Sequence, residues 1–244
     1  MKTRKIIINI LGGVIMVSAL IFVVESCKKD STAVTPAATS PVYAYDATNY
    51  GKTNAQWAAE WWKWNLQFDC VHFPLRDTTG AYANQNQSGS VFFLSGRRGH
   101  TLSVTVPAGV SLFLPLITFE SDYPCASDTS SHPAPGESVE HFLTTMTQAN
   151  VAAMDQLSLT IDGDSIAHVN NFKVLSPLFT MTANADLAGC YDDCLNGSLQ
   201  SFVGGGYFFM LRPLSKGTHT IHRVGGASAL FPFLYDITYH ITQQ

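Results

Sequence analysis

Apolar side chains recur at helical spacing in two segments of the chain. The first carries a stripe of aromatic residues at intervals of four, three and four positions: Trp57, Trp61, Trp64 and Phe68. Thr53 and Gln56 precede this stripe with the spacing of a capping box. The second segment, residues 137–154, gathers its apolar positions on one face: Val139, Phe142, Leu143 and Met146. Both patterns predict amphipathic helices.

Elsewhere the apolar runs are short, often alternate with polar residues, and end at turn-forming residues. Eight of them predict strands: residues 91–94, 102–106, 111–117, 157–161, 172–182, 207–211, 218–224 and 234–242. Two longer polar regions, 120–136 and 184–206, read as irregular loops. Strands and helices do not alternate regularly, as a parallel α/β sheet would require. The pattern therefore predicts a mainly β domain, an antiparallel β-sandwich or jelly roll with two peripheral α-helices.

The chain opens with a short basic segment followed by an apolar run over residues 6–24, and Cys27 follows a serine. This order is typical of a secretory signal. A small residue directly before the cysteine predicts lipoprotein processing, in which Cys27 carries the lipid. A glutamate two positions before the cysteine departs from that pattern, and the run is long enough to span a membrane. An uncleaved anchor is therefore the alternative.

These features divide the chain into a lipoprotein signal peptide at 1–26, a flexible tether at 27–45 and a single domain at 46–244. The tether contains Ser, Thr, Ala and Pro without apolar periodicity. Its start, Cys27-Lys28-Lys29-Asp30, resembles lipoproteins of the Bacteroidetes type. We expect the mature protein to be held on the outer membrane through the lipid on Cys27, on either the periplasmic or the cell-surface face.

Charge and cysteine content narrow the choice of partners. Loss of residues 1–26 removes three basic residues and one acidic residue, which changes the formal charge from −4 to −6. The mature part has no basic patch, so a nucleic-acid partner is disfavoured. Four cysteines remain after Cys27, and an even number in an exported chain predicts two disulfides with three possible pairings: Cys70, Cys125, Cys190 and Cys194. A zinc site is disfavoured because it needs reduced thiolates.

Candidate binding residues fall in one helix and in the two polar regions. Trp62 points away from the aromatic stripe, so we expect it either to be exposed and available for stacking on a sugar or to pack on another part of the protein, whereas the stripe itself is expected to be core. The polar regions contribute further ligand-binding candidates: Glu120, Asp122, His132, Asp192 and Asp193. Oxygen-rich loops can hold calcium, and carboxylates near a histidine can perform acid–base chemistry. No cofactor is predicted, and calcium is possible. The alternative is a solvated surface loop.

The last two predicted strands place several polar residues on one face, including His222, Asp236 and His240. If His222 pairs with Asp236, the next pairs are Thr220 with Thr238 and Thr218 with His240. These three residues are weak candidates for a metal site, with a solvated strand face as the alternative. The other face carries Ile221, Ile237, Tyr239 and Ile241, which are expected to face the core.

Several phrases of this sequence together resemble a family of uncharacterised exported bacterial proteins: Trp57-x3-Trp61-Trp62-x-Trp64, 87–94, Pro107-Ala108-Gly109 with Phe113-Leu114-Pro115, Ser176-Pro177-x-Phe179, and 210–221. The resemblance covers most of the mature domain and implies no reaction. The sequence contains no nucleophile elbow, His-Glu-x-x-His helix or phosphate-binding loop. We therefore expect a lipid-anchored binding module for carbohydrate or another envelope component. A polysaccharide hydrolase and a structural subunit of an outer-membrane assembly are the alternatives.

Overall fold

The computed structural model describes residues 40–128, 130–229 and 231–244, and for residues 231–233 the backbone alone. These residues belong to one compact unit that begins at Thr39. The predicted signal peptide, Cys27 and the first part of the tether lie outside the described residues. Among the described residues, no helix is both long and apolar enough to cross a membrane.

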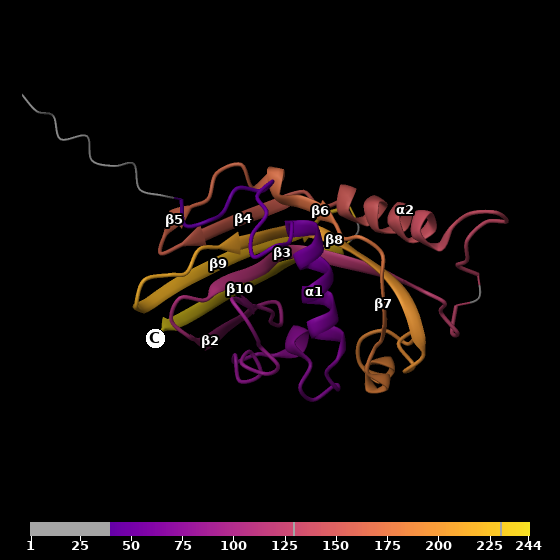
Figure 1. The fold of residues 1–244 in the computed structure, drawn as a ribbon, viewed down its shortest axis with the longest axis horizontal. Helices are drawn as coiled ribbons and strands as arrows, with labels where there is room; N and C mark the ends of the chain where they lie inside the picture. Colours follow the sequence, from indigo (N-terminus) through magenta and orange to yellow (C-terminus); the bar gives the residue numbers. More distant parts are fainter. Residues whose placement is uncertain (1–39, 129, 230) are drawn as a thin grey trace, which may run out of the picture. The chain divides into compact units, whose positions relative to one another are not determined.

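Two five-stranded sheets form the body of this unit (Figure 1). The first sheet contains β1 (Val91–Phe93), β3 (Ser111–Tyr123), β8 (Leu199–Leu211), β6 (Lys173–Leu175) and β7 (Phe179–Thr182). The second contains β2 (His100–Val106), β10 (Phe231–Gln243), β9 (Gly217–Ala227), β4 (Gln156–Ile161) and β5 (Asp164–Ser165). The predicted mainly β sandwich with two helices is confirmed. Two strand pairs, β1 with β3 and β2 with β10, are parallel, so the sheets are mixed.

Apolar side chains from both sheets meet in one core. In β2, the buried residues Leu102, Val104 and Val106 alternate with exposed threonine and serine, as expected for a strand with one face on the core. The predicted core face of the last strands is also confirmed, because its four residues are all at most 1% exposed: Ile221, Ile237, Tyr239 and Ile241. β8 differs, because almost every residue from Phe202 to Leu211 is buried. Its sheet is therefore covered on both faces.

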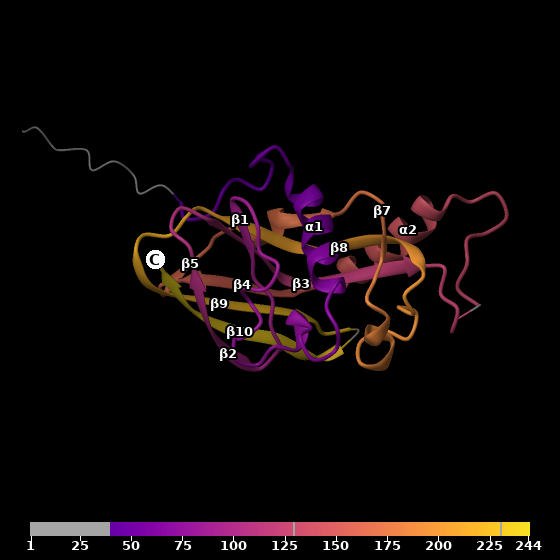
Figure 2. The same ribbon diagram turned by 60° about the horizontal axis from the view of Figure 1, so that its bottom comes forward.

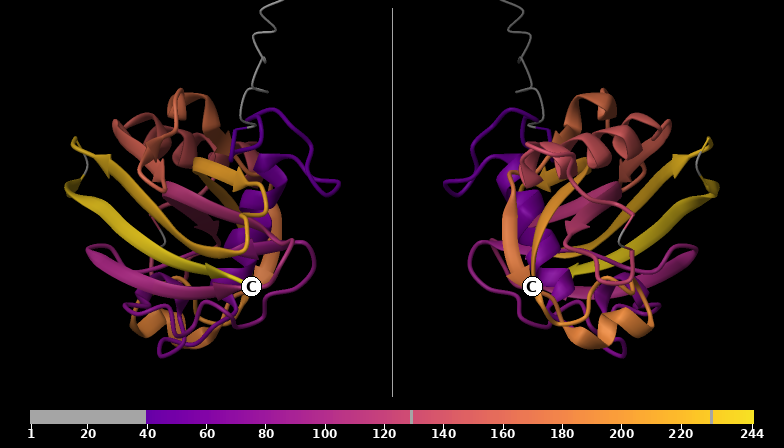
Figure 3. Two further views of the ribbon diagram at one scale, coloured as in Figure 1. Left: turned by 90° about the vertical axis from the view of Figure 1, so that its left-hand side faces the viewer. Right: turned by 90° about the vertical axis from the view of Figure 1, so that its right-hand side faces the viewer.

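Helix α1 (Asn54–Leu66) supplies the second cover of that sheet. Its capping box forms as predicted, with the Gln56 backbone donating to the Thr53 hydroxyl oxygen and the Thr53 backbone donating to the Gln56 side chain. Figure 2 shows α1 running across β3 and β8, and the end views of Figure 3 place it on the side away from β9 and β10. The aromatic stripe is core, except that Trp57 is only half-buried.

Trp62 is buried against β8, so of the two alternatives for this side chain the structure shows packing and not exposure. It is 1% exposed and its indole N–H donates to Thr118 at 3.2 Å. The reason lies in β8, where a Cβ atom on Gly204 would come within 2.2 Å of the Trp62 ring. The bare backbone at Gly204 lets α1 lie close to the sheet. Side chains outside the aromatic stripe are thereby buried as well.

Helix α2 (Val139–Ala152) packs on β3 and β8 over the part of the first sheet that the second sheet leaves uncovered (Figure 1). Its buried residues are Leu143, Thr147 and Val151. Three short 3-10 helices complete the elements: η1 (Pro74–Arg76), η2 (Val169–Phe172) and η3 (Ala185–Gly189). Residues 41–43, which the sequence placed in the tether, pair with β8 through Val42 and Leu211, so the folded unit begins earlier than expected.

The two predicted disulfides are present, and the structure gives their pairing. Cys70 bonds Cys190, and Cys125 bonds Cys194. Both bridges end in the segment that follows η3, and they connect it to the segment after α1 and to the segment after β3. The segment between Cys190 and Cys194 is therefore fixed at both ends.

Candidate functional site

The second half of β3 carries two acidic side chains. The strand continues to Tyr123, six residues beyond its predicted end, so Glu120 and Asp122 lie on a strand and not in a loop. Because side chains alternate along a strand, these two residues point to the same side of the sheet. Glu120 is 7% exposed and Asp122 is half-buried.

A segment 70 residues further along the chain brings more acidic groups to the same place. Tyr191, Asp192 and Asp193 lie between the two disulfide-bonded cysteines. The Tyr191 hydroxyl donates to Oε1 of Glu120 at 3.2 Å. Asp122 and Asp192 offer carboxylate oxygens that lie within 4.8 Å of each other. We call Glu120, Asp122 and Asp192 the acidic cluster.

The electrostatics of the acidic cluster are unfavourable for its negative charges. Burial, together with the nearby charges of Asp122 and Asp192, raises the pKa of Glu120 to about 8, although the Tyr191 hydrogen bond acts in the opposite direction. Burial and the charge of Asp192 raise the pKa of Asp122 to about 7. Among the described residues, no Lys, Arg or His forms an ion pair with these three carboxylates. The like charges are thus brought together without a cation to balance them.

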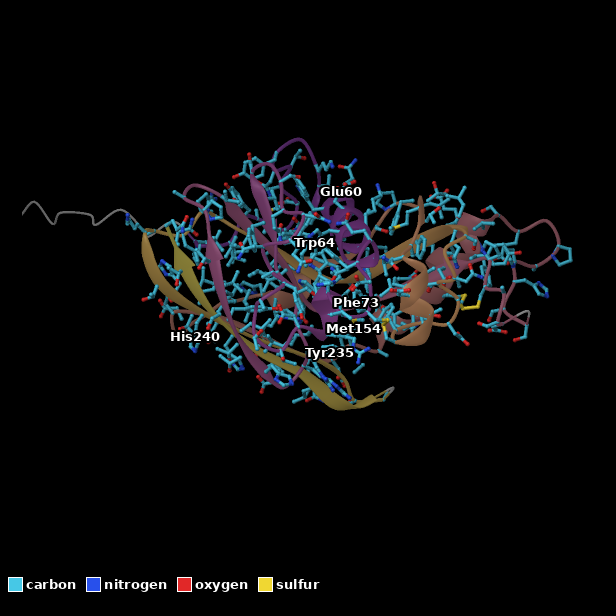
Figure 4. All side chains as sticks on the ribbon, turned by 90° about the horizontal axis from the view of Figure 1, so that it is seen from below. Glu60, Trp64, Phe73, Met154, Tyr235 and His240 are labelled. Atoms are coloured by element: carbon cyan, nitrogen blue, oxygen red, sulfur yellow. A yellow bond between two sulfur atoms is a disulfide. The ribbon has the colours of Figure 1, made fainter. Side chains whose placement is uncertain are left out.

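A pocket of about 380 Å³ opens beside the acidic cluster. Its walls combine four polar residues, Thr118, Glu120, Asn150 and Asp192, with apolar and aromatic side chains from both sheets, from the end of α2 and from the disulfide-fixed segment: Ile117, Phe119, Met154, Tyr191, Ala227 and Tyr235. Met154 and Tyr235 are labelled in Figure 4, with Glu60 and His240 well away from them. Tyr191 is 40% exposed even though its hydroxyl is buried against Glu120, so its ring presents an aromatic surface at the pocket.

A smaller cavity of about 140 Å³ shares four of these wall residues: Ile117, Thr118, Tyr191 and Tyr235. Its other side is lined by Trp62, Phe73 and two arginines, Arg76 and Arg223. Arg223 is 2% exposed and donates to the Leu116 carbonyl at 2.6 Å and to the Tyr239 hydroxyl at 3.1 Å. The two cavities together therefore offer carboxylate acceptors on one side and a guanidinium donor on the other.

Several predicted site residues take no part in this arrangement. His132 is exposed and lies within hydrogen-bonding distance of the carbonyl of its neighbour Pro133, and it does not line the pocket. Asp193 is exposed at the edge of the acidic cluster, where its charge contributes to the raised pKa of Asp122. Trp62 is too buried to stack on a ligand from outside, but it lines the smaller cavity.

His222, Asp236 and His240 lie on the polar face of β9 and β10, away from the acidic cluster. Their predicted register is wrong by two residues, because His222 lies opposite Thr238 and His240 lies opposite Thr220. A shift of the strand register by two residues does not change which face of the sheet a side chain occupies. These three side chains therefore still share the predicted face. His222 hydrogen-bonds Asp236 diagonally at 2.8 Å. Within the described ranges, no group of potential metal ligands includes these residues.

Sequence reasoning missed four residues of the site: Tyr191, Gln200, Asn150 and Tyr235. Tyr191 had a signal, since it lies between a predicted disulfide cysteine and the candidate Asp192. Gln200 was assigned to an irregular region but belongs to β8, where it donates to Asp122. Asn150 and Tyr235 come from α2 and β10, and no local pattern relates either one to Glu120.

Comparisons with known proteins found no matching family model, no matching curated protein and no matching solved structure.

Proposed function

We propose that this chain is an exported, lipid-anchored binding module of the outer membrane, and that the pocket beside the acidic cluster binds a saccharide of the cell envelope or its surroundings. The export signal and the lipid on Cys27 are predictions from the sequence. The choice of ligand class comes from the pocket itself.

One observation carries the choice of this pocket. Glu120 lines the pocket, and its Oε2 atom is buried and has no hydrogen-bond partner among the described residues. A buried polar atom without a partner costs about 1–3 kcal/mol. A ligand hydroxyl that hydrogen-bonds Oε2 would recover this cost, and it would explain why a carboxyl group is present at so buried a position.

The surroundings of Glu120 favour a sugar among hydroxyl-bearing ligands. Sugar rings present hydroxyls around their edge and C–H groups on their faces. The pocket offers carboxylate and amide groups from Glu120, Asp192 and Asn150 next to the rings of Tyr191 and Tyr235. Aromatic rings with a few well-placed polar groups are typical of small-molecule sites. A volume of about 380 Å³ accommodates one or two sugar rings.

A glycan array probed with the purified protein tests this proposal, followed by affinity measurements on the glycan that binds best. We expect Glu120→Ala to raise the Kd at least about tenfold, because the ligand loses a hydrogen bond to a charged or strongly polar acceptor. Glu60→Ala is the matched control. Glu60 is a half-buried carboxylate on α1 that pairs with Lys52 and Lys63 and does not line the pocket. Its removal should change the Kd less than about twofold.

Absence of saturable binding to any glycan by the folded, disulfide-bonded protein would refute the proposal. Equal losses in the Glu120 and Glu60 variants would refute the assignment of the pocket. Release of reducing ends from the bound glycan would instead favour the hydrolase alternative, which is supported by the two carboxylates, Glu120 and Asp192, that line one pocket.

A further inference from the structure

One arginine lies on the core face of β9. Because side chains alternate along a strand, Arg223 shares its face of the sheet with the fully buried Ile221, and it is only 2% exposed. Arginine is almost never buried to this degree without a partner of opposite charge. Among the described residues, no carboxylate forms an ion pair with Arg223. A positive charge is therefore buried between the two sheets without a counter-ion in the described part of the chain.

The fold uses only part of this guanidinium. Nη1 of Arg223 donates to the Leu116 carbonyl at 2.6 Å, and Nε donates to the Tyr239 hydroxyl at 3.1 Å. Leu116 lies in the irregular part of β3, where the pairing with β8 shifts. A guanidinium carries five N–H hydrogens, so these two bonds leave donors unused. Nη2 in particular donates to no described residue, and it is available to a ligand.

The smaller cavity of about 140 Å³ gives a ligand access to Arg223, which lines it. Arg76 of η1 lines the same cavity, is exposed and forms no ion pair with a described residue. Among the described residues, no acidic side chain lines this cavity. Like charges that face one cavity repel each other unless an anion balances them. The lining of the smaller cavity therefore indicates an anionic group as its occupant.

The two neighbouring cavities differ in charge. They share four wall residues, but the larger pocket is lined by Glu120 and Asp192 and the smaller cavity by the two arginines. A ligand that spans both cavities therefore needs hydroxyl groups at one end and a negative charge at the other. Burial raises the pKa of Glu120 to about 8, so near neutral pH its carboxyl group is mostly protonated and does not repel an anionic ligand.

We propose that the saccharide is acidic and that its carboxylate lies in the smaller cavity, bound by Arg223 and Arg76. This inference rests on the proposed function, because it specifies the ligand of the same site. A carboxylate is planar and accepts two parallel hydrogen bonds from one guanidinium. In a uronic acid the carboxylate is attached directly to the sugar ring, so a ring in the larger pocket places its charge in the adjacent cavity. The ring hydroxyls remain free to reach Glu120.

Matched pairs of oligosaccharides test the charge of the ligand. One member of each pair contains glucuronate, galacturonate or mannuronate. The other member is its carboxyl-reduced form, in which a CH₂OH group replaces the carboxylate. We expect the wild-type protein to bind the acidic member of at least one pair at least about tenfold more tightly in titration calorimetry, because hydrogen bonds between charged groups are stronger than neutral ones.

Two variants and a control locate the carboxylate. Arg223→Gln should weaken binding of the acidic member at least about tenfold and leave the Kd of the reduced member within about twofold of the wild-type value. Arg76→Gln should act in the same direction by at least about threefold, since Arg76 is exposed and its charge is screened by solvent. Arg97→Gln is the matched control, an exposed arginine that lines neither cavity. It should keep the wild-type preference.

The ratio of the two Kd values separates recognition of the carboxylate from a structural role, because a general loss of structure weakens both members of a pair equally. If Arg223→Gln fails to fold, the wild-type protein and Arg76→Gln decide the outcome. Arg76 is exposed, so its replacement does not disturb the core.

Saturable binding with equal affinity for both members of every pair would overturn this inference and leave the proposed function standing. A preference for the acid that Arg97→Gln reduces as much as Arg76→Gln would overturn the placement of the carboxylate in the smaller cavity. Tighter binding of a sulfated glycan than of any uronic acid would overturn the choice of a carboxylate. Absence of binding to every glycan would refute the proposed function itself.

Discussion

Two aspartates of this protein, Asp162 and Asp122, have pKa values that are shifted in opposite directions by their surroundings. At the turn between β4 and β5, Asp162 accepts a hydrogen bond from the Thr220 backbone at 2.8 Å and lies 2.7 Å from Nδ1 of His219. The other ring nitrogen of His219 lies 2.9 Å from the Ser215 carbonyl oxygen. These partners lower the pKa of Asp162 against the effect of burial. In the acidic cluster, burial and neighbouring carboxylates raise the pKa of Asp122.

The difference separates a structural role from a functional one. The Asp162–His219 pair connects three segments, and every polar atom that it uses has a partner inside the protein. The acidic cluster leaves Oε2 of Glu120 and Oε1 of Gln200 without partners in the described part of the chain. A cluster of this kind reduces the stability of the folded protein. Its presence is therefore better explained by a ligand than by folding.

The largest expected effect comes from removing the disulfide beside the acidic cluster. Replacing Cys125 and Cys194 together by serine opens a bridge that spans 69 residues, and we expect a loss of about 2–4 kcal/mol in the free energy of unfolding, measured by urea denaturation. The double variant without Cys70 and Cys190 is the control. It should lose similar stability, and an unchanged free energy of unfolding in the variant without Cys125 and Cys194 would contradict this expectation.

A pair of matched substitutions tests the comparison directly. Asp162→Asn should lower the free energy of unfolding by about 1 kcal/mol, a value reduced because the Asp162 side chain is 46% exposed. Asp122→Asn in EDTA should leave stability unchanged or raise it, because it removes a charge from a group of like charges. Both values come from urea denaturation in the same buffer. A loss for Asp122→Asn as large as that for Asp162→Asn would show that the acidic cluster stabilises the fold, contrary to our interpretation.

The smallest effect concerns pH. Burial alone would lower the pKa of His219, but its bonds to Asp162 and Ser215 outweigh burial and raise that pKa above its ordinary value of 6.5. The protonated ring therefore contributes stability that is fully present below about pH 6.5 and is lost as the pH rises through the raised pKa. We expect the urea midpoint to fall as the pH rises above about 6.5, and the ionisation of Glu120 and Asp122, whose raised pKa values are about 8 and about 7, adds to this fall. His219→Gln should reduce this fall, whereas His240→Gln, at an exposed position of β10, should not. Equal pH profiles for both variants would exclude His219 as the source.

The local sequence pattern was sufficient to predict the elements that bury one face and expose the other. The capping box, the aromatic stripe of α1 and the core face of β9 and β10 all follow from spacing alone, because each depends on neighbours within one element. The two-residue error at His222 and Asp236 has a physical reason as well. A shift by two preserves which face each side chain occupies, so hydrophobic pattern cannot distinguish the two registers.

The sequence by itself determined the export signal as a prediction, the mainly β class, both helices and the presence of two disulfides. Only the tertiary structure decided that Glu120 and Asp122 lie on a strand, that Trp62 is buried against Gly204, and that Gln200 hydrogen-bonds Asp122. Polar residues near the end of a strand resemble a loop when they are read alone. They become strand residues here because β8 pairs with β3 along its whole second half and because two disulfides bring a distant loop over them. The two disulfides join residues 120 and 69 positions apart, beyond the reach of any local pattern.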